Sequence, residues 1–242
     1  MDDLLFVAAV VLAAAGLHSL VGFGSAMVAM ALLAGRLGLG MAAPLVALVA
    51  FTLEGLLLAR YRSALNVRAV WRLIAGALVG VPAGVLVLSR LPETLMLAGL
   101  GLVIAGYAVY SWLGRRPPEL RGAGWAFGSG ALAGLLGGAY NVSGPPVIVY
   151  ADCRRWPPEE FKSNLQGFFL VSDALVIAGH GLAGHLTAPV WGIYLAALPA
   201  LGLGLGAGLA LGQKVPAAAF RRLTWAVLLV LGARLVWTAL RV

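Results

Sequence analysis

The stretch Gly137-Gly138-Ala139-Tyr140-Asn141-Val142-Ser143-Gly144-Pro145-Pro146 interrupts an apolar segment that runs over residues 123–151. Another long apolar segment, residues 4–34, is interrupted in the same way by Gly22-Phe23-Gly24-Ser25. Each segment would form a helix of about 45 Å, too long for one upright crossing of a hydrocarbon core of about 30 Å and too short for two crossings. A re-entrant helical hairpin, which enters the membrane part way and returns, fits both the length and the break.

The other apolar segments are each about 20 residues long, the length that crosses a bilayer as a single helix. They cover residues 41–59, 69–89, 95–113, 161–179, 189–211 and 220–240. Of the 242 residues, 62% are hydrophobic and only 11% are charged. This composition excludes a soluble globular protein and predicts an all-α polytopic membrane protein, built as one integral membrane domain.

The order of one broken segment and three simple spans occurs twice, in residues 1–114 and in residues 123–242. Matching residues recur at similar offsets: Trp71 and Trp191 at 120, Gly84 and Gly204 at 120, Glu54 and Asp173 at 119, Gly22 and Gly137 at 115. The smaller offset implies a short insertion at the second break, and the chain is predicted to be an internal duplication. Three crossings and one returning hairpin make the crossing number odd, so the two halves form an inverted repeat.

The positive charges test this topology, because cytoplasmic loops carry an excess of Lys and Arg. With two returning hairpins the 17 Lys and Arg divide 13 to 4, whereas single crossings of the broken segments would divide them 9 to 8. The 13 are Arg60, Arg62, Arg68, Arg72, Arg115, Arg116, Arg121, Arg154, Arg155, Lys162, Lys214, Arg221 and Arg222, and the 4 are Arg36, Arg90, Arg234 and Arg241. We therefore expect a multi-pass inner-membrane protein with both termini periplasmic. The net charge of +8 belongs to these loops, so no nucleic-acid partner is expected.

The second helix of each hairpin is expected to begin just after the break. Ser25 and Ser143 stand where an N-cap residue belongs, and Pro145 falls in a first turn that needs no N–H partner. Helix N-termini combine unpaired N–H groups with the positive end of the helix dipole, and inverted-repeat transporters place substrate at such broken helices. The residues predicted to bind a small anion are Gly22, Phe23, Gly24, Ser25, Tyr140, Asn141, Ser143, Gly144 and Pro145. In the alternative interpretation, the glycines serve only to turn the hairpins tightly.

Three more polar side chains near the tips are candidates for the same site. His18 precedes the first tip, where its imidazole either faces the substrate or bonds a neighbouring carbonyl. Lys162 and Gln166 follow the second tip at the start of the next span. Lys162 either attracts an anion from the cytoplasm or belongs to the charges that set orientation.

Glu54 and Asp173 are the two carboxylates, out of nine, that fall inside simple spans. An acid in a membrane helix is costly to keep charged and usually faces a cavity, an ion or a proton path. We predict that these acids couple transport to protons, and a purely structural carboxyl is the alternative. The inverted topology places Glu54 toward the cytoplasmic face and Asp173 toward the outer face.

The sequence carries no pattern of an enzyme or a metal site. Cys153 is the single cysteine, and His180 and His185 have no third ligand nearby. There is no Ser-His-Asp or His-Glu-x-x-His arrangement, so no catalytic residue, metal or cofactor is expected. The regularly spaced glycines are predicted to let helices pack closely; they are Gly76, Gly80, Gly84, Gly204, Gly208 and Gly212.

Two glycine-rich stretches resemble the paired signatures of the TauE/SafE family of sulfite and organosulfonate exporters. They are Gly16-Leu17-His18-Ser19-Leu20-Val21-Gly22-Phe23-Gly24 and residues 130–137, which continue to Gly144-Pro145-Pro146. Phe161-Lys162-Ser163 resembles the family's Phe-Arg-Ala-Thr stretch, and Phe220-Arg221-Arg222-Leu223 is also similar. The chain departs from the family where its first tip reads Gly-Phe-Gly-Ser instead of a glycine run, and where Lys162 replaces the usual Arg. The resemblance implies transport of a small sulfur oxyanion or sulfonate, by export or by uptake.

Together these observations predict a proton-coupled secondary transporter of a small sulfur-containing anion: sulfite, thiosulfate or an organosulfonate. The substrate is expected between the two hairpin tips near the membrane midplane. A passive anion channel of the same architecture is the alternative. The expected partners are the anion and the lipid bilayer, with the protein a monomer or a homodimer.

Overall fold

In a computed structural model, which describes residues 2–114, 118–120, 122–212 and 217–241, the chain is all-helical. The helices are α1 (Asp2–Val21), α2 (Ser25–Leu37), α3 (Leu39–Tyr61), η1 (Arg62–Ala64), α4 (Val67–Arg90), α5 (Glu93–Trp112), α6 (Ala123–Tyr140), α7 (Gly144–Cys153), α8 (Pro158–Leu182), α9 (Ala188–Leu211) and α10 (Ala217–Leu240). Among the described residues, six helices are long and apolar enough to cross a membrane. The prediction of an all-α polytopic protein is thereby confirmed. Arg115, Arg116, Arg121 and Lys214 lie outside the described residues.

Each long apolar segment is broken into two helices that pack on each other, α1 with α2 and α6 with α7. The arms are unequal, with 20 and 13 residues in the first pair and 18 and 10 in the second. A helix of 20 residues is about 30 Å long, which is enough to cross a hydrocarbon core. The length of α1 therefore does not by itself require a hairpin that turns back within the membrane, and the re-entrant topology stays a prediction.

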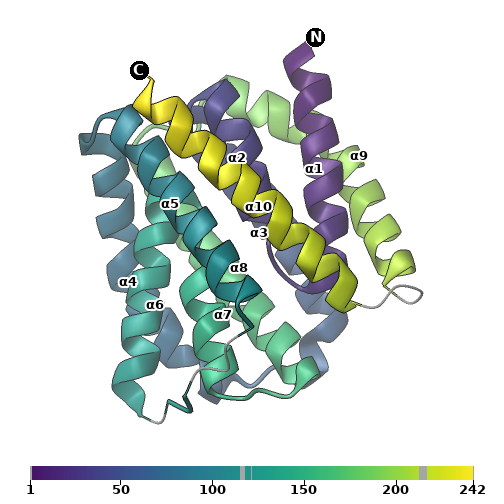
Figure 1. The fold of residues 1–242 in the computed structure, drawn as a ribbon. Helices are drawn as coiled ribbons and strands as arrows, with labels where there is room; N and C mark the ends of the chain where they lie inside the picture. Colours follow the sequence, from purple (N-terminus) through teal and green to yellow (C-terminus); the bar gives the residue numbers. More distant parts are fainter. Residues whose placement is uncertain (1, 115–117, 121, 213–216, 242) are drawn as a thin grey trace. The chain divides into compact units, whose positions relative to one another are not determined.

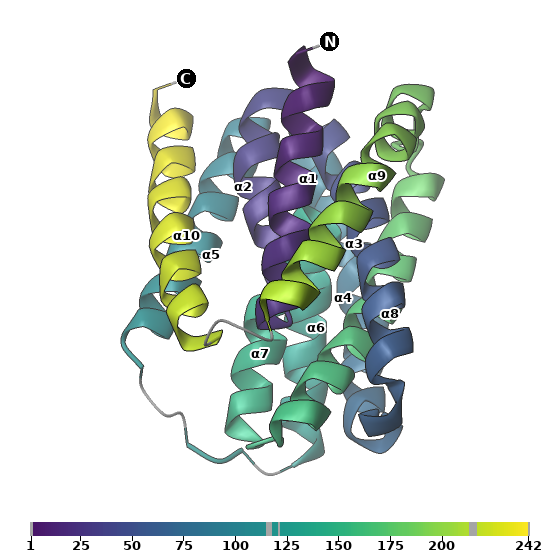
Figure 2. The same ribbon diagram turned by 90° about the vertical axis from the view of Figure 1, so that its right-hand side faces the viewer.

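The helices form two compact units, and each unit takes helices from both predicted repeats. Unit 1 comprises residues 1–49, 90–115 and 186–242, and unit 2 comprises residues 50–89 and 116–185. Inside unit 1, α1 packs along α9 and α10 packs along α5 (Figures 1 and 2). The start of α1 and the end of α10 lie at the same end of this unit (Figure 2).

Glycines bring pairs of helices into backbone contact within each unit. In unit 2, a Cβ added at Gly76, Gly80 or Gly84 of α4 would overlap the backbone of α6. In unit 1, a Cβ added at Gly204 or Gly208 of α9 would overlap the backbone of α1. The predicted packing role is confirmed for these five glycines. In both pairs, the first helix of a broken segment in one predicted repeat packs on a simple helix of the other predicted repeat.

Unit 2 gathers positive charges at one end, where the start of α8 is bonded to the turn after α3. The N–H of Asn66 donates to Oδ1 of Asn164 (2.8 Å), and Oγ of Ser163 donates to the carbonyl of Tyr61 (2.9 Å). The helix ends and turns at this end carry Arg60, Arg62, Arg68, Arg72 and Lys162. All five belong to the charges that the sequence assigns to the cytoplasmic side.

Candidate functional site

The first hairpin turn is built by two glycines in the left-handed region. Gly22 (φ 93°) ends α1, with its N–H donating to the carbonyl of His18 (2.6 Å), and Gly24 (φ 100°) is the N-cap of α2. Glycine adopts such backbone angles with little steric cost. A Cβ at Gly24 would come no closer than 4.0 Å to its nearest neighbour, Cε of Met27. The turn therefore requires glycine for its conformation and not for lack of space.

The N-terminus of α2 presents backbone donors that no side chain caps. Its first helical hydrogen bond runs from the N–H of Val28 to the carbonyl of Gly24 (3.1 Å). The N–H groups of residues 25–27 therefore have no acceptor within the helix. The prediction that Ser25 is the N-cap is wrong. The residue just before α2 has a left-handed backbone conformation, and that residue is Gly24, which is therefore the N-cap. Ser25 instead becomes the first residue of α2.

The first tip is buried and held from two sides inside unit 1. Oγ of Ser25 lies 2.7 Å from Nδ1 of His18, so this imidazole nitrogen bonds a hydroxyl and not the backbone carbonyl that the sequence allowed. Phe23 packs edge-on against the ring of Tyr107 in α5, with the ring centroids 6.5 Å apart. His18, Phe23 and Ser25 are all buried. These contacts fix the turn between α1 and α2.

The second hairpin turn uses an asparagine where the first uses a glycine. Asn141 (φ 53°) ends α6, and its N–H donates to the carbonyl of Gly137 (2.7 Å). Asparagine is one of the few residues that tolerate this conformation. In the predicted duplication, Asn141 thus takes the place of Gly137 as the residue matched to Gly22, at an offset of 119 that equals the offset between Glu54 and Asp173. This correction removes the insertion that the sequence comparison required.

The second tip offers a side-chain amide in place of backbone donors. Pro145 and Pro146 have no N–H, which leaves Gly144 as the backbone donor in the first three positions of α7. Ser143 is the N-cap, as predicted, but its side chain makes no capping hydrogen bond. Both Nδ2 and Oδ1 of Asn141 are buried with no hydrogen-bond partner among the described residues. An unpaired buried amide costs about 1–3 kcal/mol, a cost that a bound ligand would offset.

Helix α8 brings a further polar atom to this tip, one that the sequence analysis missed. A Cβ built on Gly137 would lie 3.5 Å from Oγ of Ser172 and 3.4 Å from Cβ of Ser143. Ser172 is buried, and its hydroxyl oxygen has no partner among the described residues. Its position directly before Asp173 is the only signal for it in the sequence. The end of α6 in unit 2 is thus bordered by three polar residues: Asn141, Ser143 and Ser172.

Glu54 and Asp173 form one pair inside unit 2. Both are buried, and their carboxyl groups share a hydrogen bond. Oε2 of Glu54 and Oδ2 of Asp173 have no partner among the described residues. The expectation that the acids face opposite sides of the membrane is wrong, because α3 and α8 pack side by side, with Gly55 close to Leu170.

The other predicted site residues are divided between the units. The first tip and His18 belong to unit 1, whereas the second tip, Lys162 and Gln166 belong to unit 2. Gln166 is buried in α8. The Lys162 ammonium lies over the ring of Tyr61, 5.7 Å from its centroid, at the positively charged end of unit 2. Tyr140 and Pro145 are buried, and Gly144 is half-buried.

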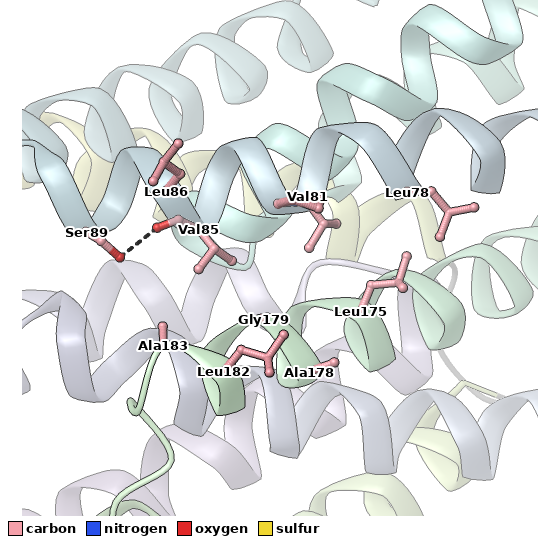
Figure 3. Close-up of a pocket in the computed structure, with 11 residues that line it drawn as sticks. Leu78, Val81, Val85, Leu86, Ser89, Leu175, Ala178, Gly179, Leu182 and Ala183 are labelled. Carbon is pink, nitrogen blue, oxygen red and sulfur yellow. Dashed lines mark hydrogen bonds between the residues drawn. The ribbon is translucent and has the colours of Figure 1, made fainter.

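Two apolar grooves in the described chain have walls unsuited to an anion. The groove between α4 and α8, of about 470 Å³, is lined by residues such as Leu78, Val85 and Leu182 (Figure 3). Its one hydroxyl, on Ser89, donates to the carbonyl of Val85 (2.9 Å). A groove of about 330 Å³ in unit 1, bounded by α1, α2, α9 and α10, is similarly apolar. An anion needs hydrogen-bond donors, so the tips are better candidates than these grooves.

Comparison with known proteins identifies the family. The sequence model described as "Sulfite exporter TauE/SafE" matches residues 7–235. The chain belongs to this family. A TauE/SafE relative from Cupriavidus necator, described as "Probable sulfite/organosulfonate exporter TauE", is 32% identical over 234 residues, which cover 92% of this chain and 90% of the relative. No solved structure matches the chain.

Membership of the TauE/SafE family confirms the resemblance predicted from the glycine-rich stretches and from Phe161-Lys162-Ser163. The family consists of exporters, so the chain is a membrane transporter and not an enzyme. The roles of individual tip residues, of His18 and of the acid pair stay predictions.

Proposed function

We propose that this TauE/SafE protein is a secondary transporter that moves a small sulfur-containing anion across the inner membrane, driven by protons. Sulfite, thiosulfate and organosulfonates are the proposed substrates, since the Cupriavidus necator relative is named for sulfite and organosulfonate. The observation that carries the proposal is the side-chain amide of Asn141, buried and unpaired where α6 ends and α7 is about to begin. A donor left unpaired at a helix N-terminus is suited to an oxyanion.

The proposed binding chemistry differs between the two tips. The oxygens of a sulfite or sulfonate accept hydrogen bonds from the N–H groups of residues 25–27 at the first tip and from Nδ2 of Asn141 and the N–H of Gly144 at the second. The positive ends of the α2 and α7 dipoles favour the negative charge. In this proposal each tip is an anion-binding element, and the two predicted repeats have opposite orientation in the membrane, with both termini periplasmic.

The proposed coupling element is the acid pair of Glu54 and Asp173. Loss of its shared proton would leave two neighbouring negative charges buried together, which is strongly unfavourable. The pair is also next to the second tip along α8, because Ser172 precedes Asp173 and lies beside Gly137 and Ser143. A change in the charge of the pair therefore acts on the same helix segment that borders the tip.

Reconstitution into proteoliposomes tests the proposal. Purified protein is first titrated with sulfite, thiosulfate, sulfoacetate, taurine and sulfate to find the bound anion. That anion is then supplied at equal concentration on both sides, and a pH gradient is imposed. A proton-coupled transporter concentrates the anion on one side, and reversal of the pH gradient reverses the accumulation. A protein that leaves the anion at equal concentration under the pH gradient, yet dissipates an imposed anion gradient, is a passive channel. No binding of any sulfur anion would contradict the proposed substrate class.

A further inference from the structure

The end of α8 in unit 2 carries a pair of histidines for which the proposed transport cycle has no role so far. Nδ1 of His180 lies 2.9 Å from Nδ1 of His185, and the ring centroids are 5.2 Å apart. His180 is fully buried, whereas His185, on the turn after α8, is half-exposed. A hydrogen bond between two imidazoles thus connects a partly exposed ring to one with no contact with solvent.

The imidazole of His180 has a second ring nitrogen besides Nδ1. Its Nε2 is buried and has no hydrogen-bond partner among the described residues. Burying an unpaired ring nitrogen is unfavourable unless something binds it during function.

His180 lies on the same face of α8 as the acid pair. It follows Asp173 by seven residues, which is about two helical turns and about 10 Å along the axis. Asp173 has its own buried and unpaired oxygen, Oδ2, and Ser172 has an unpaired hydroxyl. Helix α8 therefore carries Asp173 of the acid pair and, two turns later, His180. His180 in turn bonds the half-exposed His185 just after the helix.

We propose that His185 and His180 carry protons between the aqueous phase and the Glu54–Asp173 pair. The inference rests on the proton coupling proposed above, and it assigns the entry path for that proton. Water is the carrier for the two helical turns between Nε2 of His180 and Oδ2 of Asp173. On the predicted topology, this path opens on the periplasmic side.

The transfer is balanced in protons and involves no change in electrons. A proton from water binds Nε2 of His185, and the hydrogen on its Nδ1 passes to Nδ1 of His180. His180 then releases the hydrogen on its Nε2 to a water molecule, which protonates Oδ2 of Asp173. Return of each ring to its starting tautomer readies the pair for another proton. Because one proton leaves His180 as another arrives, the buried ring carries extra charge only in passing.

Among the described residues, two ionisable groups face the ends of this path. His185 is the titratable group that faces His180, and Glu54 is the one that faces Asp173. Where contacts with α8 are described, α4 and α6 meet it through Val85 and Gly137, which do not titrate. The histidine pair is therefore the described route from the acid pair toward solvent at this end of α8.

Substitution of each histidine tests the relay in proteoliposomes. We expect His180→Gln and His185→Ala to slow pH-driven substrate accumulation at least tenfold, while substrate binding and substrate exchange at equal pH stay at wild-type levels. Exchange returns the carrier without net proton movement, so it does not use the path. Leu182→Gln, at a 93% exposed position on the same helix end, is the matched control and should behave as wild type.

Added imidazole gives a second measurement that a purely structural role would not affect. A diffusible imidazole can replace the exposed ring, so it should restore accumulation by His185→Ala and leave wild type unchanged. This arm keeps the test decisive even if His180→Gln fails to fold. Wild-type accumulation in folded His180→Gln and His185→Ala proteins would overturn the relay and leave the proposed function standing. If the wild-type protein moves its anion without protons, the coupling fails, and the relay fails with it.

Discussion

Nδ1 of His18 lies 2.7 Å from Oγ of Ser25 and joins the last turn of α1 to the first residue of α2. The bond spans the turn formed by Gly22, Phe23 and Gly24, so the turn is closed by a side-chain contact as well as by its backbone. Because Ser25 bonds His18 and does not cap its own helix, the first N–H groups of α2 stay available.

Replacing Gly24 with alanine should weaken anion binding. Alanine at φ 100° is strained by about 1–2 kcal/mol, so the turn is expected to relax and move the N–H groups of α2. We expect Kd for the transported anion to rise at least tenfold, which is about 1.4 kcal/mol, in a calorimetric titration. Gly40→Ala is the control, since Gly40 has no neighbour within 4 Å of an added Cβ. Unchanged affinity in a monodisperse Gly24→Ala protein would refute the first tip as a binding element.

Asn141→Gly should separate binding from folding at the second tip. Glycine keeps the left-handed conformation but removes the unpaired amide. The free energy of unfolding of the variant is expected to lie within about 1 kcal/mol of the wild-type value. Removing the unpaired amide stabilises the folded state, and the greater backbone entropy of glycine in the unfolded state opposes this gain. Anion affinity should fall about tenfold. Equal affinity in both proteins, measured beside thermal unfolding, would show that the amide does not contact the anion.

Neutralising either member of the acid pair should uncouple transport. Glu54→Gln or Asp173→Asn fixes a neutral side chain of the same size, so substrate binding is expected to persist while pH-driven accumulation is lost. The double variant should be no worse than either single one, because each single substitution already removes proton exchange by the pair. Glu159→Gln, an exposed position on α8, is the control. Accumulation by both single variants would mean that the acids are structural.

Gly80→Ala should destabilise unit 2. The added methyl group overlaps the backbone of α6 at Ala131, and overpacking of this kind costs about 1–3 kcal/mol. Gly202→Ala in α9 is the comparison, because an added Cβ there meets nothing within 4 Å. A lower unfolding temperature in detergent is expected for Gly80→Ala only. Similar unfolding temperatures for the two variants would contradict the close helix contact.

Reporter fusions test the membrane topology. Fusions after Arg116 and after Arg155 should both be cytoplasmic, and a fusion after His185 should be periplasmic, because the charge division of 13 to 4 favours that orientation. Cytoplasmic activity of only one of the first two fusions would rule out the returning second hairpin, and with it the inverted repeat.

The helices and the turns could be read from the sequence because local chemistry determines them. Apolar runs set the helices, and α4 (Val67–Arg90) begins and ends within two residues of its apolar segment, residues 69–89. The turns required residues that tolerate positive φ, and Gly22, Gly24 and Asn141 are such residues. The error at Gly137 arose because glycine was assumed at a turn where asparagine serves equally well.

The side-chain pairs could not be read in this way because they depend on which helices are neighbours. Glu54 and Asp173 are 119 residues apart, and symmetry alone placed them on opposite sides. The contact of α3 with α8, which joins them, is a property of packing that no periodicity encodes. His180 and His185 follow the apolar segment 161–179, and their spacing does not reveal that one ring is buried and the other half-exposed.

The backbone contact between α1 and α9 has a consequence for how the protein is made. Some 170 residues separate these helices, so α9 leaves the ribosome roughly ten to thirty seconds after α1, at about 5–20 residues per second. Until then the carbonyl groups of Leu12 and Gly16, against which Gly204 and Gly208 pack, are covered by lipid or by the insertion machinery. Unit 2 is complete once residue 185 has been synthesised. Its helices can therefore assemble first, and a ribosome stalled near residue 185 would hold a finished unit 2 and an α1 that still lacks its α9 partner.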